Sequence, residues 1–330
     1  MILKYPERVR NVDVREEVCL LLTQVKRYGF ISNGRTGTIR AQRRFRPPAC
    51  QINVLQEFGK RMITMSQSPP ENMPMSDPDT LRPARPPGTA RAIGRSLHVY
   101  YGDRERAAEM DALYAEFVRS GDLVFDIGAH VGDRIASFRR LGAKVVALEP
   151  QPGAMRALRL IHGRDADVTL LRAAVGPQPG EITLHVNSAN PTVSTASAEF
   201  LEAASGAPGW EGQSWDHAIT VPLVSLDSLI AQYGMPAFAK IDVEGFEAAV
   251  LAGLSQPLPA LSFEFTTIQR GIVHDCLAQL ARLGDYRFDF ALGESQMLTG
   301  TWQDADSLAA TIDALPAQAN SGDVYARLRQ

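Results

Sequence analysis

Residues 122–133 read Asp-Leu-Val-Phe-Asp-Ile-Gly-Ala-His-Val-Gly-Asp. The apolar run 123–127 ends in a turn that contains Gly128 and Gly132, and a helical pattern begins at about Asp133. A strand, a glycine turn and a helix in this order present backbone N–H groups to an anionic ligand group. The stretch therefore predicts a ligand-binding turn at the end of a buried strand.

A second apolar run, residues 145–148, ends on Glu149. This acid follows Gly128 by 21 positions, which is where nucleotide-binding units place a carboxylate for ribose hydroxyls. Together the turn and the acid predict a nucleoside cofactor. A dinucleotide is not expected, because its Gly-x-Gly-x-x-Gly fingerprint would need glycine where His130 and Asp133 stand.

The pattern Asp126-x-Gly128-x-His130-x-Gly132 resembles motif I of class I S-adenosylmethionine-dependent methyltransferases, with His130 in place of the middle glycine. Farther along, residues 240–247 read Lys-Ile-Asp-Val-Glu-Gly-Phe-Glu. This block resembles the most distinctive signature of the FkbM family of methyltransferases. The chain is therefore identified, by resemblance, as an FkbM-type methyltransferase.

The resemblance extends over about residues 98–328. Shorter matching pieces are Val224-Ser225-Leu226-Asp227, Phe263-Glu264-Phe265 and Gly322-Asp323-Val324-Tyr325-Ala326. Two positions depart from the family: His130 stands where Asn is usual, and Thr266 stands where His is frequent.

Alternation of apolar runs with helical patterns predicts an α/β fold with a doubly wound, mainly parallel sheet covered on both faces. The expected strands are residues 123–127, 144–148, 168–172, 182–186, 238–242, 261–265, 285–291 and 322–327. The expected helices are residues 104–119, 133–141, 152–162, 225–233, 245–252, 270–283 and 304–313. The resemblance implies the Rossmann-like class I methyltransferase fold, with the last two strands as a terminal antiparallel pair.

Ligands of such sheets bind beyond the carboxyl ends of the strands. The residues expected to contact S-adenosylmethionine there are Asp126, Gly128, Ala129, His130, Gly132, Glu149, Pro150, Arg172 and Ala173. Glu149 is expected to accept the ribose hydroxyls, although it could instead cap the helix 152–162. Asp126 could bind either the turn or the cofactor's ammonium group. His130 could be a hydrogen-bonded structural group, and Arg172 and Ala173 are expected against the adenine.

Three acids at strand ends are the expected catalytic residues: Asp242, Glu244 and Glu264. Neighbouring carboxylates can raise one another's pKa, bind a divalent cation or accept a substrate proton. No residue is assigned to a metal, and a divalent cation stays an open possibility. Glu244 could alternatively cap a helix that begins at Gly245, and Glu264 could form a buried pair with Lys240 or with an arginine.

The segment 187–217 is polar and turn-rich, and it contains Trp210 and Trp215. A long loop in a compact domain is often a lid or a specificity element. Exposed tryptophans would suit a sugar or polyol, and the alternative is a surface excursion. The expected reaction is O-methylation of a hydroxyl on a carbohydrate or secondary metabolite. The alternatives are a nicotinamide-dependent oxidoreductase and a non-catalytic scaffold that binds a nucleoside cofactor.

The composition fits a cytoplasmic enzyme acting on a small-molecule or glycan acceptor. The net charge is −3 and the pI is near 6.1, so no strong field favours nucleic acid or an anionic membrane. Three scattered cysteines form no disulfide framework, and no apolar stretch approaches the ~20 residues that span a bilayer. The oligomeric state is not predicted.

The chain is expected to divide near residue 95. Residues 1–94 are basic and then proline-rich, which predicts an extended, mobile or dispensable segment, since proline disfavours helix. The basic residues 1–61 could be a nucleic-acid-binding or partner-binding arm. Translation could instead start at Met62, Met65, Met73 or Met75. Residues 95–330 are expected to form the methyltransferase domain.

Overall fold

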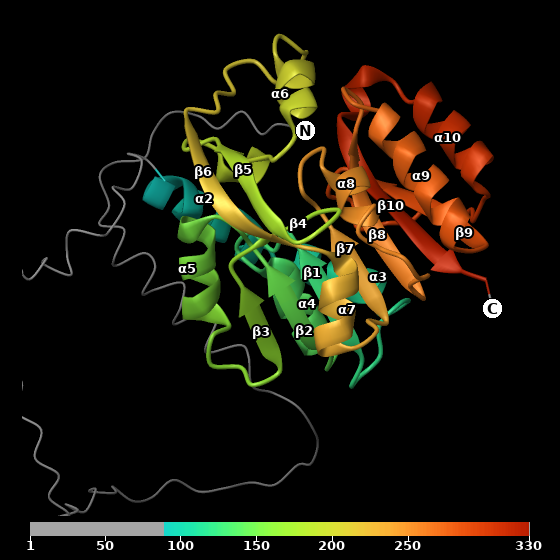
Figure 1. The fold of residues 1–330 in the computed structure, drawn as a ribbon, viewed down its shortest axis with the longest axis horizontal. Coiled ribbons are helices and arrows are strands. Elements are labelled where there is room, and N and C mark those ends of the chain that lie inside the picture. The colour runs from blue at the N-terminus through green and yellow to red at the C-terminus, as the bar shows by residue number, and fades with distance from the viewer. Residues whose placement is uncertain (1–88, 330) are drawn as a thin grey trace, which may run out of the picture. The chain divides into compact units, whose positions relative to one another are not determined.

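A seven-stranded sheet lies at the centre of the computed structural model, which describes residues 89–329 (Figure 1). The strand order is β3-β2-β1-β7-β8-β10-β9, in which β10 is antiparallel to both neighbours and the first five strands are parallel. The strands are β1 (Leu123–Ile127), β2 (Lys144–Leu148), β3 (Val168–Leu171), β7 (Phe238–Ile241), β8 (Ala260–Thr266), β9 (Tyr286–Leu292) and β10 (Ser321–Leu328). This arrangement confirms the expected class I methyltransferase fold and its terminal antiparallel pair.

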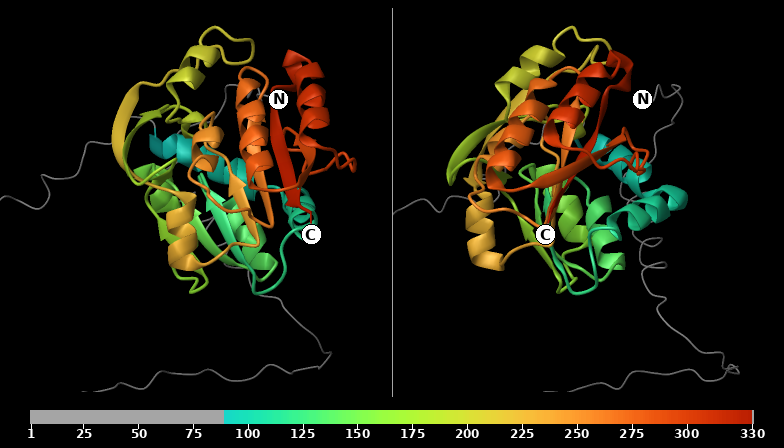
Figure 2. Two further views of the ribbon diagram at one scale, coloured as in Figure 1. Left: turned by 45° about the vertical axis from the view of Figure 1, so that its right-hand side comes forward. Right: turned by 90° about the vertical axis from the view of Figure 1, so that its right-hand side faces the viewer.

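Successive side chains of a strand point to opposite faces of the sheet. Helices cover both faces because the parallel strands carry apolar side chains on each of them. Phe125 and Ile127 of β1 pack into one core with four helices, and Val124 packs into a second core with three others. The first face carries α7 (Leu226–Tyr233), α8 (Glu247–Leu251), α9 (Gly271–Leu283) and α10 (Ala305–Ala314). The second face carries α3 (Arg104–Tyr114), α4 (Asp133–Arg140) and α5 (Pro152–Ile161). The turned views in Figure 2 show the sheet between these two helical layers.

The structure also contains a small second sheet with the order β4-β6-β5. The sequence predicted one of its strands, at residues 182–186, but not a separate sheet. Its strands are β4 (Ala174–Val175), β5 (Gly180–Val186) and β6 (His217–Val224). Pro222 obscures β6 in the sequence, because proline cannot donate to a ladder. It is tolerated because β4 pairs only with Leu223 and Val224, so β6 is an open edge at Pro222.

The segment between β5 and β6 is not one long loop. It contains the 3-10 helix η2 (Pro191–Val193) and α6 (Ala198–Ala204), whose N-cap Ser197 accepts a hydrogen bond from the Phe200 N–H group. A second 3-10 helix, η3 (Ala317–Ala319), precedes β10. The connection from β5 to β6 is therefore partly helical.

Helix α2 (Thr89–Tyr101) lies across the expected boundary at residue 95. Residues 89–94 were expected to be extended, but proline density falls after Pro87 and a helical apolar pattern takes over. Ile93 and Leu97 are buried with Val131 and Ala154. The rest of the expected 1–94 segment lies outside the described residues. In the described part of the chain, every helix is too short or too polar to cross a membrane.

Candidate active site

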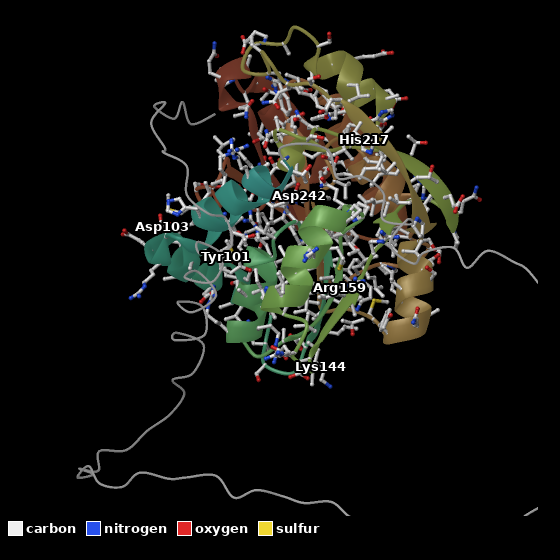
Figure 3. The ribbon with its side chains drawn as sticks, turned by 90° about the vertical axis from the view of Figure 1, so that its left-hand side faces the viewer. Tyr101, Asp103, Lys144, Arg159, His217 and Asp242 are labelled. Atoms are coloured by element: carbon white, nitrogen blue, oxygen red, sulfur yellow. The ribbon has the colours of Figure 1, made fainter. Side chains whose placement is uncertain are left out.

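A pocket lies over the carboxyl ends of β1, β2, β7 and β8. Figure 3 shows Asp242, which follows β7, well separated from Lys144, which begins β2 at the opposite end of the sheet. The cofactor candidates that line the pocket are Asp126, Gly128, Ala129, His130, Glu149, Pro150 and Ala173, and the lining also includes all three catalytic candidates. The structure thus brings most of the sequence candidates together.

Two cofactor candidates lie elsewhere. Arg172 is exposed and does not line the pocket, because β3 ends at Leu171 and the following Ala173 turns inward instead. Gly132 faces the protein interior, where a Cβ would lie 2.6 Å from a Leu158 methyl carbon. Gly132 therefore lets the turn pack closely against Leu158 of α5.

The glycine turn is shaped by a close approach to β7. Gly128 has φ +85°, and a Cβ there would lie 1.8 Å from the Asp242 carbonyl oxygen, so only glycine fits. The N–H groups of Gly128 and Ala129 both donate to the Leu148 carbonyl, and that of His130 donates to Glu149. The expectation that these N–H groups face an anionic ligand is therefore wrong for this structure, since they already have protein partners.

The far side of the turn is held by two helices. The Tyr101 hydroxyl at the end of α2 donates to the Val131 carbonyl at 3.1 Å. The His162 Nε2 atom lies 3.0 Å from the Gly132 carbonyl oxygen and 3.1 Å from the same hydroxyl. Burial lowers the pKa of His162 to about 4, so the ring is neutral at physiological pH. Neither residue was singled out in the sequence, because their roles depend on tertiary packing.

Glu149 is buried and holds the turn through its carboxylate. One oxygen accepts from the His130 N–H group at 2.9 Å and the other from the Gln151 N–H group at 2.7 Å. Burial raises the pKa of Glu149 to about 8, while the two backbone hydrogen bonds act in the opposite direction. Each carboxylate oxygen has a second lone pair, which leaves room for ligand hydroxyls.

His130 and Asp126 carry buried polar atoms without hydrogen-bond partners. Both ring nitrogens of His130 and the Oδ2 atom of Asp126 are buried and have no hydrogen-bond partner. The alternative interpretation of His130 as a hydrogen-bonded structural group is therefore wrong. Burial lowers the pKa of His130 to about 4 and raises that of Asp126 to about 7. Such groups need partners that a bound ligand can supply.

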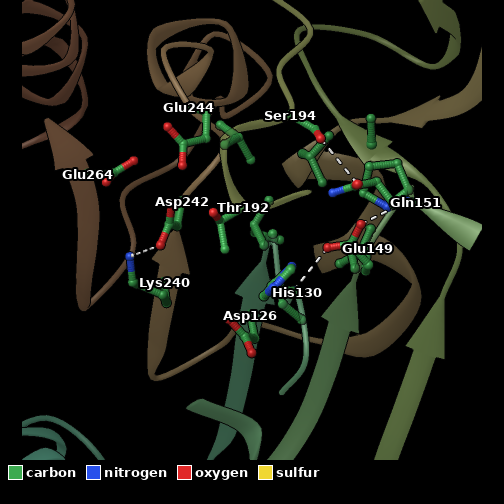
Figure 4. Close-up of a pocket in the computed structure, with 18 of the residues that line it drawn as sticks. Asp126, His130, Glu149, Gln151, Thr192, Ser194, Lys240, Asp242, Glu244 and Glu264 are labelled. Atoms are coloured by element: carbon green, nitrogen blue, oxygen red, sulfur yellow. Dashed lines mark hydrogen bonds and ion pairs between the residues drawn. The ribbon is translucent and has the colours of Figure 1, made fainter. Parts of the chain in front are cut away.

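The three acids converge at the other side of the pocket (Figure 4). One carboxylate oxygen each of Asp242, Glu244 and Glu264 lies within 4.8 Å of the other two. The strand does not continue through them as the shared-face argument assumed, since β7 ends at Ile241 and Glu244 has φ 56°. Burial and the charge of Asp242 raise the pKa values of Glu244 and Glu264 well above the ordinary value.

Asp242 has a different environment because Lys240 lies beside it. The Lys240 ammonium is 3.1 Å from Asp242 Oδ2 and 2.8 Å from Asp323 Oδ1. Burial raises the pKa of Asp242, but the charges of Lys240 and Arg134 outweigh that effect and hold the pKa below its ordinary value. Asp242 is thus ionised at neutral pH. The alternative pairing of Lys240 with Glu264 is wrong.

The alternative role of Glu244 as a helix cap is also wrong. Helix α8 begins at Glu247, and it is the Glu247 carboxylate that accepts from the Val243 N–H group at 3.0 Å. The side chain of Glu244 points into the pocket (Figure 4).

An ion network that the sequence did not reveal closes one side of the pocket. Arg106 and Arg134 both contact Asp133 Oδ2, at 3.1 and 2.6 Å, and Glu294 Oε2, at 2.6 and 3.3 Å. The four residues come from α3, α4 and the loop after β9, so no local pattern could have grouped them.

The tryptophans do not form an exposed sugar platform. Trp210 is buried edge-on against Phe200, and the Trp215 indole N–H donates to the Val193 carbonyl. The same segment does supply pocket residues, because Ser194 donates to the Gln151 side chain at 3.2 Å and Thr192 lies beside them.

Comparisons with known proteins match part of the chain to methyltransferases. Residues 126–288 match the model of the Methyltransferase FkbM domain. The hexuronic acid methyltransferase AglP of Haloferax volcanii is 25% identical over 188 residues, which are 56% of this chain and 72% of that protein.

Solved methyltransferase structures are similar over most of their length. An O-methyltransferase from Bacillus cereus in complex with SAH is 13% identical, with a TM-score of 0.36, over 76% of this chain and 94% of that one. Precorrin-6y C5,15-methyltransferase from Geobacter metallireducens is 13% identical, with a TM-score of 0.34, over 68% of this chain and 87% of that one.

The matched segment contains both the glycine turn and the signature block 240–247. The matched family is a family of methyltransferases. The comparisons therefore give no support to the oxidoreductase alternative. Residues 126–288 thus match the FkbM family of methyltransferases, and the chain is similar to a methyltransferase of Haloferax volcanii.

Proposed function

We propose that this chain transfers the methyl group of S-adenosylmethionine to a hydroxyl oxygen of a carbohydrate or a similar polyol. The observation that carries the proposal is the contact between the glycine turn and the Asp242 backbone. It sets an ionised carboxylate directly beside the turn that defines the cofactor end of the pocket.

The cofactor half of the proposal rests on buried groups without partners. Glu149 faces the ribose hydroxyls with its free lone pairs, and Ala173 leaves space for the flat adenine. Asp126 and His130 offer their unpartnered atoms to the polar amino-acid end of the cofactor. Pro150 adds an apolar wall.

The transfer step of the proposed reaction depends on the pocket acid Asp242. The acceptor oxygen attacks the methyl carbon in line, the carbon–sulfur bond breaks, and its electron pair stays on sulfur. Asp242 orients the acceptor hydroxyl and receives its proton, which typically contributes ~10²–10⁴-fold to the rate. Proximity and orientation supply much of the remainder.

A carbohydrate acceptor is proposed on two grounds. The pocket lining offers hydroxyl and amide groups from Thr192, Ser194 and Gln151, which suit a polyol. The AglP protein, to which the chain is 25% identical over 188 residues, is by name a hexuronic acid methyltransferase. A non-catalytic scaffold is the competing possibility, and the ionised Asp242 argues against it.

The test is a transfer assay with methyl-labelled S-adenosylmethionine and a panel of acceptors. The panel contains hexuronic acids, neutral hexoses, a polyol and an amine. We expect label in a methyl ether of a sugar and formation of S-adenosylhomocysteine in equal amount. Label on nitrogen alone would contradict the proposed atom, and binding without turnover on a broad panel would favour the scaffold.

A further inference from the structure

The three pocket acids form a cluster of carboxyl groups in which Lys240 pairs with Asp242 alone. Asp242, Glu244 and Glu264 each contribute an oxygen to a space less than 4.8 Å across. Glu264 Oε2 is buried and has no hydrogen-bond partner, and the Glu264 side chain points toward the other two (Figure 4). Carboxyl groups this close together need a proton or a cation between them.

The cations nearest to the cluster are committed to other acids. Lys240 divides its ammonium group between Asp242 and Asp323. Arg134 is held by Asp133 and Glu294. Within the described residues, therefore, no ion pair reaches Glu244 or Glu264. Lys240 contacts only Oδ2 of Asp242, which leaves Oδ1 free to bind.

The cluster is also held in place by the backbone. Asp242 and Glu264 stand at or next to the ends of β7 and β8. The Glu244 carbonyl accepts from the Thr195 hydroxyl at 2.6 Å, which fixes this residue in its left-handed conformation. Carboxylates held on rigid elements do not have to move to meet a ligand.

We propose that Asp242, Glu244 and Glu264 bind one hard divalent cation, of the Mg²⁺, Mn²⁺ or Ca²⁺ type. Such cations take oxygen ligands and keep several positions for water or substrate. The cluster supplies three carboxylates from one side, and Asp242 is 33% exposed toward the pocket. The open positions then face the space where the acceptor lies.

The role of the cation rests on the proposed methyl transfer. A bound divalent cation acts as a Lewis acid and lowers the pKa of a coordinated hydroxyl. The acceptor oxygen becomes a better nucleophile, and its proton passes to a carboxylate of the cluster or to water. An acceptor with two adjacent oxygens would be favoured, because it can occupy two positions of the cation.

The primary test is binding of Mn²⁺ alone to the full chain, followed by electron paramagnetic resonance and calorimetry. Neither cofactor nor acceptor is present, so the result is independent of the transfer assay. We expect one saturable site per chain, weakened at least about tenfold by Glu264→Gln and by Glu244→Gln. The exposed Glu181→Gln on β5 removes the same charge elsewhere and should leave binding unchanged.

Thermal unfolding of each variant without metal separates lost ligands from lost structure. A variant that unfolds like the wild type but no longer binds Mn²⁺ supports the site. If a variant does not fold, competition by Mg²⁺ and Ca²⁺ for Mn²⁺ on the wild type still tests it. The proposal would be overturned if Mn²⁺ showed no saturable binding up to about 1 mM, the weak end of protein calcium sites. Shared protons would then be what keeps the three carboxyl groups together. Equal binding by Glu264→Gln and wild type would overturn it too.

Discussion

At the scale of single residues, Asp242 and His162 show how burial and partners set the charge at the site. Asp242 stays ionised because Lys240 and Arg134 outweigh its burial. His162 stays neutral because burial outweighs the Gly132 hydrogen bond and the nearby acids, which act to raise its pKa. The sequence identified Asp242 through the signature block, but His162 carries no local signal and is visible only in the folded chain.

Replacing Asp242 by Asn should slow methyl transfer while sparing cofactor affinity. The change keeps the shape of the side chain and removes the charge that orients the acceptor and accepts its proton. We expect a fall in kcat of ~10²-fold or more, with the Kd for S-adenosylhomocysteine changed far less. Single-turnover transfer and calorimetry measure the two effects. Transfer at the wild-type rate would remove Asp242 from the chemistry and make Glu264 the leading candidate.

His162 should make the protein sensitive to mild acid. The pKa of His162 is about 4 in the folded chain and 6.5 when unperturbed. Between pH 6.5 and 4, therefore, His162 is protonated in the unfolded chain and neutral in the folded chain. Stability from this residue is complete above pH 6.5 and is lost as the pH falls toward 4. The wild type should lose on the order of 2–3 kcal/mol relative to His162→Gln across that window. Urea unfolding at several pH values checks this, and parallel stability curves would contradict it.

At the scale of elements, strand periodicity predicted the central sheet well. The five parallel strands are mainly apolar, as expected for strands buried on both faces, and their ends fix where the pocket lies. The elements that sequence reasoning missed are short or contain misleading residues. β4 has two residues, β6 contains Pro222, and α6 lies in a segment whose polarity suggested a loop.

The turn after β1 should not tolerate a side chain at Gly128. Gly128→Ala combines a positive φ with a Cβ that would lie 1.8 Å from the Asp242 carbonyl oxygen. Gly121→Ala is a matched control, because Gly121 has φ +91° and open space around it. The control should lose about 1–2 kcal/mol, and Gly128→Ala should lose more and should also weaken S-adenosylhomocysteine binding. Equal losses in chemical denaturation, with equal ligand affinity, would show that the close approach is unimportant.

At the scale of the whole molecule, contacts between distant segments complete the site. Glu294 reaches Arg106 and Arg134 from the loop after β9, and Tyr101 of α2 holds the turn near Val131. Sequence patterns report local structure, so they placed the acids at strand ends but could not pair these partners. For the same reason the expected boundary at residue 95 missed the first turns of α2.

We propose that the catalytic unit begins at about Thr89 and does not need the residues before Arg85. A chain that starts at Arg85 should unfold cooperatively and bind S-adenosylhomocysteine. A chain that starts at Arg95 lacks Ile93, which packs with Val131 behind the turn, and burial of an isoleucine is worth about 2–5 kcal/mol. Its Tm should be lower by at least about 4 °C. Failure of the longer chain to fold would show that earlier residues complete the core.

The most direct test of the central claim is calorimetric titration of the full chain with S-adenosylhomocysteine, because it requires no knowledge of the acceptor. We expect saturable binding that Glu149→Gln weakens by about 1–3 kcal/mol, since a buried carboxylate at the pocket is lost. Thermal unfolding without ligand checks that the variant is folded. Binding of NAD with no binding of the adenosyl ligand, or an unchanged affinity in Glu149→Gln, would contradict the account.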